Sequence, residues 1–205
     1  MITVDFLLTS LIVVLIPGTG VLFTVSTGLA RGKRASVFAA LGCTAGILPH
    51  LLAAIAGLAA VLHMSSLAFQ ALKLAGAAYL LYLAYATWRD TGALRVEAAA
   101  TASASPRTLV TRAFLLNILN PKLSIFFLAF LPQFVAPQAA SPLSQMLTLS
   151  GIFMAMTFAV FVGYGVLADA FRHAVIDSPR FQAWLRRGFA AAFAGLGVEL
   201  ALAER

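Results

Sequence analysis

The sequence predicts an all-α polytopic membrane protein, with six transmembrane helices arranged as two inverted three-helix repeats. Of the 205 residues, 61% are hydrophobic and only 10% are charged, whereas soluble domains carry about 25% charged residues. Apolar stretches close to the roughly 20 residues that a helix needs to cross a bilayer recur along the whole chain. Most basic residues fall between these stretches, in alternate loops.

Six apolar stretches define the predicted spans. The N-terminus lacks the basic region of a signal peptide, so the first stretch is predicted to be a retained helix. Much of the segment between the third and fourth spans is rich in Ala, Ser and Thr without a periodic face, which is typical of a flexible linker. The predicted spans are residues 5–27, 37–61, 67–88, 112–135, 147–170 and 184–203. The expected organisation is one membrane transport domain, 1–205, with repeat one at 1–90, a cytoplasmic linker at 91–111 and repeat two at 112–205.

The distribution of Lys and Arg predicts the orientation of these helices. The first, third and fifth loops carry eleven of the 14 basic residues, while the second and fourth loops carry none. Loops rich in Lys and Arg stay in the cytoplasm, so both termini are expected on the periplasmic side of a bacterial inner membrane. The same segregation accounts for the net charge of +7 without a nucleic-acid partner, which is otherwise the usual meaning of a basic patch.

The fourth span, 112–135, is apolar in the main but is interrupted by Asn117, Asn120, Pro121 and Lys122. Proline lacks a backbone donor and clashes with the preceding turn, so the helix is expected to break here. Backbone groups freed within a bilayer persist only where protein or a watery cavity satisfies them. Lys122 falls about 15 Å along the helix from the start of the span, near the midplane. It is either a snorkelling lysine beside a packing kink or part of a substrate or ion site.

The first span has a matching interruption at Pro17 and Gly18, about as far into its helix as Pro121 is into the fourth span. Three helices per half is an odd number, so a duplicated half would be inserted in the opposite orientation. Matching breaks in corresponding helices of two inverted halves indicate a transporter site at the repeat interface. Residue similarity between the halves is weak, so the predicted repeat rests on topology.

The second span combines small residues with one histidine. Gly42 and Gly46 are four residues apart, a spacing typical of close helix packing in membranes. His50 lies near the middle of the span. It is either a neutral histidine bonded to a backbone carbonyl or a group that handles protons or substrate.

Three further polar residues lie within predicted spans. Lys73 in the third span either snorkels to the outer interface or joins the site. Tyr79 of the same span either lines a cavity or packs. Glu199 in the sixth span is the deepest acid of the second half, which makes it a second candidate for proton coupling.

The sequence shows no catalytic, metal-binding or cofactor-binding pattern. Cys43 is the only cysteine and the three histidines are scattered, so no metal-ligand spacing is present. An intramembrane enzyme would need a nucleophile with an adjacent base, and no such pair is visible. A membrane scaffold would not need matched helix breaks around a midplane lysine. Enzyme and scaffold are therefore the rival interpretations, and no enzyme activity, cofactor or metal is expected.

Short motifs spread over nearly the whole chain carry a family resemblance. They are Pro17-Gly18, Gly-Leu-Ala-Arg-Gly-Lys-Arg-Ala at 28–35, Gly42 with Gly46 and His50, Lys73-Leu-Ala-Gly-Ala-Ala-Tyr79-Leu, Asn117, Asn120-Pro-Lys, Phe126-Phe127 and Leu131-Pro-Gln-Phe134. Together they resemble the lysine exporter superfamily, and its homoserine/threonine exporter branch most closely. Two positions depart from the family pattern: Thr19 stands where the family usually has the second proline of Pro-Gly-Pro, and Ser36 replaces a common glycine.

The resemblance implies a six-helix carrier that exports amino acids across the bacterial inner membrane, driven by the proton gradient. The expected substrates are threonine/homoserine-like or other small neutral amino acids. Lys122 and the opened backbone around Asn120 would hold the substrate carboxylate, while freed carbonyls near Val13 and Asn117 would accept its ammonium. The expected site residues are Pro17, Gly18, Asn117, Asn120, Pro121, Lys122, Lys73 and Tyr79 for substrate, with His50 and Glu199 for proton coupling. The expected partners are the amino acid, protons and the lipid bilayer, and a homodimer is permitted without being required.

Overall fold

The computed structural model describes residues 2–16, 18–62, 66–89, 105–135 and 141–171, together with scattered helical residues between 183 and 202. Over these residues the chain is helical throughout and contains no strand. The elements are α1 (Val4–Leu15), α2 (Thr19–Arg31), α3 (Lys33–Ala45), α4 (Leu48–Leu62), α5 (Ser66–Arg89), α7 (Pro106–Ile118), α8 (Pro121–Ile125), the π-helical η1 (Phe126–Phe130), the 3-10 helix η2 (Leu131–Phe134) and α9 (Pro142–Ala170). The all-α prediction is confirmed for this part of the chain.

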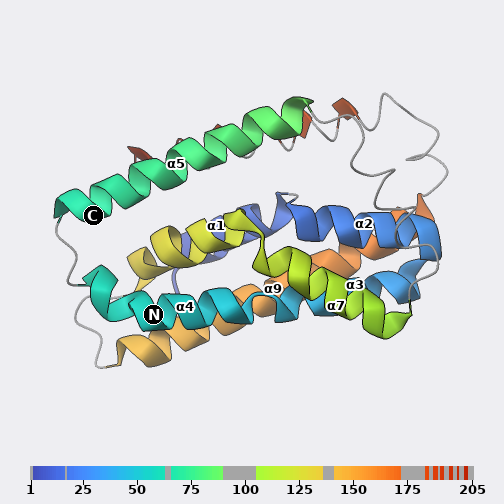
Figure 1. Cartoon of the computed structure of the whole chain (residues 1–205), viewed down its shortest axis with the longest axis horizontal. Coiled ribbons are helices and arrows are strands. Elements are labelled where there is room, and N and C mark those ends of the chain that lie inside the picture. The colour runs from blue at the N-terminus through green and yellow to red at the C-terminus, as the bar shows by residue number, and fades with distance from the viewer. Residues whose placement is uncertain are drawn as a thin grey trace.

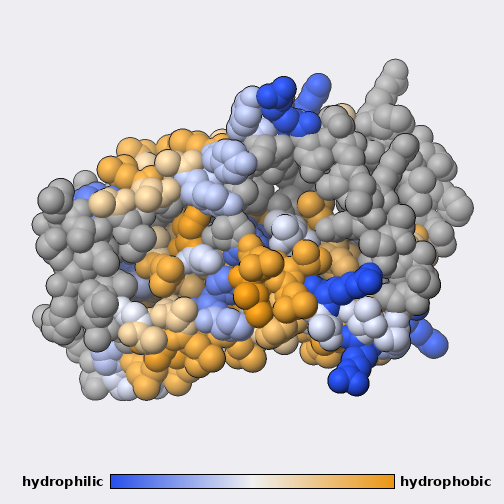
Figure 2. Space-filling view, in the orientation of Figure 1, coloured by the Kyte–Doolittle hydropathy of each residue, from blue (hydrophilic) through white to orange (hydrophobic). Residues whose placement is uncertain are grey.

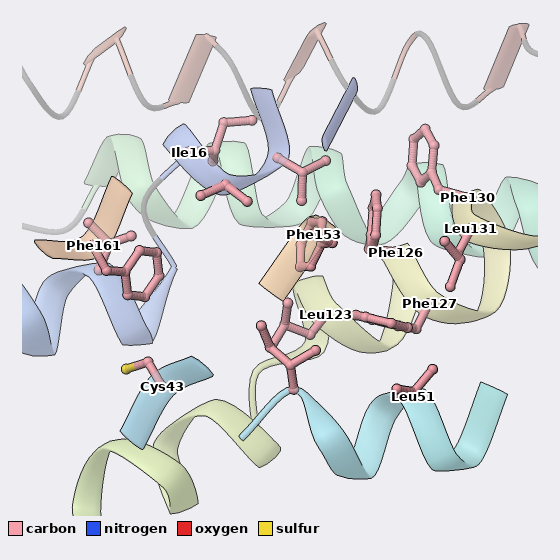
Figure 3. Close-up of a cluster of buried hydrophobic side chains, with 14 of the residues drawn as sticks. Ile16, Cys43, Leu51, Leu123, Phe126, Phe127, Phe130, Leu131, Phe153 and Phe161 are labelled. Carbon is pink, nitrogen blue, oxygen red and sulfur yellow. The ribbon is translucent and has the colours of Figure 1, made fainter. Parts of the chain in front are cut away.

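The helices run roughly along the long axis of the molecule (Figure 1). α3 packs against both α7 and α9, and α2 packs against α9 and α3, so these four form the best-packed part of the bundle. α5 lies along one edge in Figure 1 and contacts η1. At the centre is a cluster of buried aromatic rings, in which Phe126 stacks on Phe153 with ring centroids 4.2 Å apart (Figure 3).

Within the part of the chain that the structure describes, two helical segments are long and apolar enough to cross a membrane, namely Lys33–Gly57 and Pro142–Ala170. The count rises to four when each bent pair is taken as one span: α1 with α2, bent by 54°, and Pro106–Ile118 with Lys122–Phe134, bent by 55°. Large apolar side chains on the outside, such as Leu52 and Leu119, suit contact with lipid. The protein is therefore an all-α polytopic membrane protein, and the total of six spans stays a prediction.

Both predicted helix breaks are confirmed. α1 ends at Leu15 because Ile16 turns to extended backbone, and α2 restarts at Thr19 with Gly18 as its N-cap. In the second break α7 ends at Ile118, and the side chain of Asn120 caps α8 by accepting from the Lys122 backbone N–H at 3.2 Å. Pro17 lies outside the described residues.

The start of the fourth predicted span was placed too late in the chain. α7 begins at Pro106, and the hydroxyl of Ser105 caps it by accepting from the Thr108 N–H at 3.2 Å. A Ser N-cap followed by Pro at the first helical position is a strong start signal for a helix. Residues 106–111 of the predicted linker 91–111 are therefore helical.

The predicted packing role of Gly42 and Gly46 is confirmed by the approach of α3 to α7. A methyl group added to Gly42 would overlap the Val110 carbonyl and lie 2.7 Å from the Ala113 Cβ. One added to Gly46 would lie 2.8 Å from the Asn117 Cβ. Since no real Cβ tolerates such distances to backbone, these glycines set how close the second broken helix comes to α3.

Candidate substrate site at the crossing of two broken helices

The two helix breaks, about 100 residues apart in the sequence, face each other in the bundle. A Cβ added to Gly18, the N-cap of α2, would lie 2.9 Å from the Asn120 Nδ2 at the N-cap of α8. The two breaks therefore meet where the N-cap residue of α2 approaches the N-cap residue of α8. Only a residue without a side chain leaves Asn120 its place at this crossing.

Lys122 crosses from the second break to the first. Its ammonium donates to the carbonyl oxygens of Val13 at 2.9 Å and Ile16 at 2.7 Å, and the residue is only 4% exposed. Val13 lies in the last turn of α1 and Ile16 is its C-cap, at a helix C-terminus, where backbone acceptors lack an intrahelical partner and attract cations. The side chain ends on backbone inside the protein, so it does not snorkel to either interface.

Two further side chains satisfy other backbone acceptors around the breaks. The Thr19 hydroxyl donates to the Leu116 carbonyl oxygen at 3.3 Å. This hydrogen bond also joins the first break to the second. Tyr164 of α9 donates to the Leu15 carbonyl at 2.6 Å. Satisfied acceptors are what a broken helix requires within a membrane. Thr19 holds the position where the family usually has proline, and a proline would lack this hydroxyl.

Asn117 is the centre of the buried polar network around the second break. Its Nδ2 donates to the Cys43 carbonyl at 2.5 Å, at the end of α3, and its Oδ1 accepts from the Asn120 Nδ2 at 3.2 Å. Its own carbonyl lies 3.0 Å from the His50 Nε2. The residue is 1% exposed, so this one side chain joins α3 to both sides of the second break.

His50 bridges the second break from the side of α4. A carbonyl only accepts, so the contact with the Asn117 carbonyl requires the proton to be on Nε2. The Nδ1 lies 3.3 Å from the Ser124 hydroxyl of α8, which then donates to it. Asn117 precedes the break and Ser124 follows it, so the imidazole ties the two segments together. The carbonyl-bonded histidine of the first interpretation is present, and a role in proton handling stays a prediction.

Tyr79 is half-buried, and its ring lies beside that of Tyr82 of the same helix, with centroids 5.9 Å apart. Its role in the site stays a prediction. Lys73 belongs to α5, but its side chain lies outside the described residues, as does that of Pro121; Glu199 lies outside them entirely.

Sequence reasoning missed three residues that bond at the breaks, namely Thr19, Ser124 and Tyr164. Thr19 stands out in the sequence only as a departure from the family motif. Ser124 lies in α8, four residues after Asn120, and Tyr164 lies on the unbroken α9; nothing local indicates the partner of either side chain.

The site is electrically unusual because the cation, the Lys122 ammonium, donates its hydrogen bonds to neutral backbone carbonyls. The acids among the described residues, Asp5 and Asp169, lie near the ends of helices, and the described residues contain no cluster able to hold a metal ion. The Lys122 ammonium is held by the backbone carbonyls of Val13 and Ile16, which are dipoles without a net charge. Such a centre offers an ammonium for an anionic group and carbonyls for a cationic group, which together complement a zwitterion.

Opposed helix breaks that meet at a polar centre inside a membrane protein are typical of secondary transporters. The family model described as LysE type translocator matches residues 11–204. The chain therefore belongs to the LysE type translocator family, as the sequence motifs indicated.

Named relatives cover most of the chain. It is 35% identical over 199 residues to the homoserine/homoserine lactone efflux protein of Salmonella typhimurium, an alignment that covers 97% of this chain and 95% of the relative. It is 35% identical to an uncharacterized membrane protein of Vibrio cholerae, over 97% of this chain and 96% of the relative. It is 31% identical over 158 residues to the leucine efflux protein of Enterobacter sp., over 74% of each chain. No solved structure matches the chain.

Proposed function

We propose that this protein is a secondary-active carrier that exports small neutral amino acids, of the threonine or homoserine kind, across the bacterial inner membrane by proton antiport. The observation that carries the proposal is the Lys122 ammonium at the crossing of two broken helices, bonded to two backbone carbonyls. Membership of the LysE type translocators and the names of the relatives, which specify efflux of homoserine, its lactone or leucine, support the same class of substrate.

In the proposed site the two ends of the amino acid bind to opposite kinds of group. The Lys122 ammonium, with donors of the opened backbone near Asn120, holds the carboxylate, because charge-assisted bonds to an anion are strong where water is excluded. The freed carbonyls at the breaks, near Val13 and Asn117, hold the ammonium. Alternating access would then arise from movement of repeat one (1–90) against repeat two (112–205) around this centre.

The proposed orientation follows the basic residues. Figure 2 shows the most hydrophilic side chains gathered toward the end of the molecule where α3 and α7 begin and α5 ends. Lys33, Arg34, Arg89, Arg107 and Arg112 are all exposed. We assign this end to the cytoplasm by the positive-inside rule, which places both chain termini on the periplasmic side.

Counterflow into vesicles that contain the purified protein and are loaded with unlabelled amino acid tests the activity directly. Labelled homoserine, threonine and leucine should accumulate transiently, and glutamate and lysine should not. Absence of counterflow for every amino acid in the panel would favour the rival scaffold or enzyme. Net uptake into inverted vesicles should also collapse when a protonophore removes the proton gradient, and unchanged uptake would mean a uniporter.

The role of Lys122 is tested by its effect on the choice between a carboxylate and an amide. Wild-type protein should bind homoserine more tightly than its carboxamide, and Lys122→Met should lose that preference because the ammonium is gone. Lys122→Arg should also fail to transport, since a planar guanidinium cannot place its charge where a compact ammonium did. Equal discrimination by wild type and Lys122→Met would mean that Lys122 serves folding alone.

A further inference from the structure

The Val13 and Ile16 carbonyls already hold a primary ammonium group, that of Lys122, at 2.9 and 2.7 Å. The α-ammonium of an amino acid has the same charge, the same three donors and nearly the same size. The pair of carbonyls is therefore a formed ammonium site whose occupant in this structure is the protein's own side chain.

The names of the relatives make the α-ammonium the group to consider. Homoserine and leucine carry both a carboxylate and an ammonium, whereas homoserine lactone has its carboxyl group closed into an ester and keeps only the ammonium. If this protein accepts the same range, the ammonium is the charged group that all its substrates share. Recognition that depended only on a carboxylate at Lys122 could not include the lactone.

Two ammonium groups cannot share these carbonyls comfortably. Like charges a few ångströms apart repel strongly in a low-dielectric site, and the two carbonyls that accept from Lys122 are neutral, so they carry no negative charge that would offset the repulsion. A substrate ammonium that enters the site must therefore displace the ammonium of Lys122.

We infer that Lys122 is an internal surrogate for the substrate, and that binding proceeds by ammonium exchange at the carbonyls of Val13 and Ile16. The substrate ammonium takes the two carbonyls, and the released Lys122 ammonium pairs with the substrate carboxylate. A zwitterion brings no net charge, so the exchange leaves the charge of the site unchanged. Without substrate, Lys122 closes the first break, and the empty carrier keeps its backbone acceptors satisfied while it reorients. This inference rests on the proposed function.

Exchange makes Lys122 a competitor of every ammonium ligand. The apparent dissociation constant is the intrinsic one divided by the fraction of protein in which the carbonyls are free. If Lys122 occupies them about 90% of the time, its removal should tighten the binding of a ligand without a carboxylate about tenfold. Homoserine lactone should gain in this way, whereas homoserine loses the partner of its carboxylate and should gain less or bind more weakly.

Two variants test the exchange without any transport measurement. Lys122→Ala removes the side chain beyond Cβ, and n-propylammonium has the size of the missing part. Lys122→Met keeps the apolar stem and leaves only the position of the ammonium nitrogen empty, which suits the ammonium ion. The thermal midpoint and the yield of folded protein are measured after solubilisation in each ammonium salt, with n-propanol and tetramethylammonium chloride as controls. The first control has the shape without the charge, and the second has a charge without donors.

The expected result is a saturable rise of the thermal midpoint or yield of Lys122→Ala with n-propylammonium, and of Lys122→Met with the ammonium ion. Neither control should reproduce it, and wild type should not respond, because its own ammonium fills the site. Homoserine lactone should bind Lys122→Met more tightly than wild type. If neither variant responds to its ammonium salt beyond the controls, by yield or by midpoint, the carbonyls are no exchangeable site and the inference fails. Counterflow by wild type is a separate measurement, so that outcome leaves the proposed function standing.

Discussion

Replacement of Asn117 by leucine is the sharpest test of the buried network. The two side chains are close in size, so the change removes hydrogen bonds with little change of volume. It abolishes the bond to the Cys43 carbonyl and the bond from Asn120, and leaves both partners buried within the protein, since Asn120 is 4% exposed.

The expected loss of unfolding free energy in Asn117→Leu depends on whether the unfolded chain is in water or in a bilayer. An unpaired buried polar group costs about 1–3 kcal/mol in a soluble protein. Within a bilayer, the average side-chain hydrogen bond is worth only about 0.6 kcal/mol, and at most about 1.7, because the unfolded chain also finds partners there. Loss of two such bonds should therefore lower the free energy of unfolding by about 1–3 kcal/mol.

The assay is equilibrium unfolding in mixed micelles with increasing SDS, followed by helical circular dichroism. Leu115→Ala is the matched control, because Leu115 lies on the same helix, is 52% exposed and should change stability by less than about 0.5 kcal/mol. A double-mutant cycle of Asn117→Leu with Asn120→Ala isolates the bond between the two side chains, and its coupling energy should be about 0.6 kcal/mol or more. Stability of Asn117→Leu equal to wild type, with zero coupling, would falsify the view that this network holds the second break to α3.

Four further predictions follow, three from the crossing and one from the proposed orientation. Gly18→Ala should reduce transport strongly, because its new methyl group would lie 2.9 Å from the Asn120 Nδ2. Gly151→Ala is the control and should transport normally, because its methyl group would meet nothing within 4 Å. Equal activities of the two variants in counterflow would contradict this prediction. Thr19→Val removes one hydroxyl bond between the breaks and should cost about 0.5–1.5 kcal/mol of stability, measured by the same SDS unfolding, and no change would make that bond dispensable. His50→Gln offers an amide to both of its partners but cannot take up a proton at neutral pH, so it should keep counterflow and lose proton-driven uptake; intact proton-driven uptake would exclude His50 from coupling. A reporter active only outside the cytoplasm should work at the C-terminus and fail in the predicted linker, and the reverse pattern would overturn the proposed orientation.

Local chemistry was enough to predict where the helices stop. The missing donor of proline and the N-cap preference of asparagine act within a few residues, and the second break at Asn120 and Pro121 was therefore predictable. The same local rules predict the start of α7 at Ser105 and Pro106, although the residues before it show no hydrophobic period. A close helix contact at Gly42 and Gly46 was also predictable, because it depends on residue size at a regular spacing, but the identity of α7 as the partner was not.

The partners of the freed backbone groups could not be predicted in this way. The sequence singled out Lys122, Asn117 and His50 because polar residues in an apolar helix are costly. It did not reveal that Lys122 would satisfy carbonyls more than 100 residues earlier, since a hydrogen bond depends on distance in space and direction.

By itself, therefore, the sequence determined that this is a helical membrane protein of the lysine exporter kind with two broken helices. Hydrophobicity, proline and small-residue spacing act locally or on average, and they need no knowledge of neighbours. Only the tertiary structure decided that the breaks meet, that Gly18 makes room for Asn120, and that an ammonium of the protein occupies the carbonyls offered by the first break. Those features arise because backbone groups freed at one break must be satisfied by whatever the fold brings beside them.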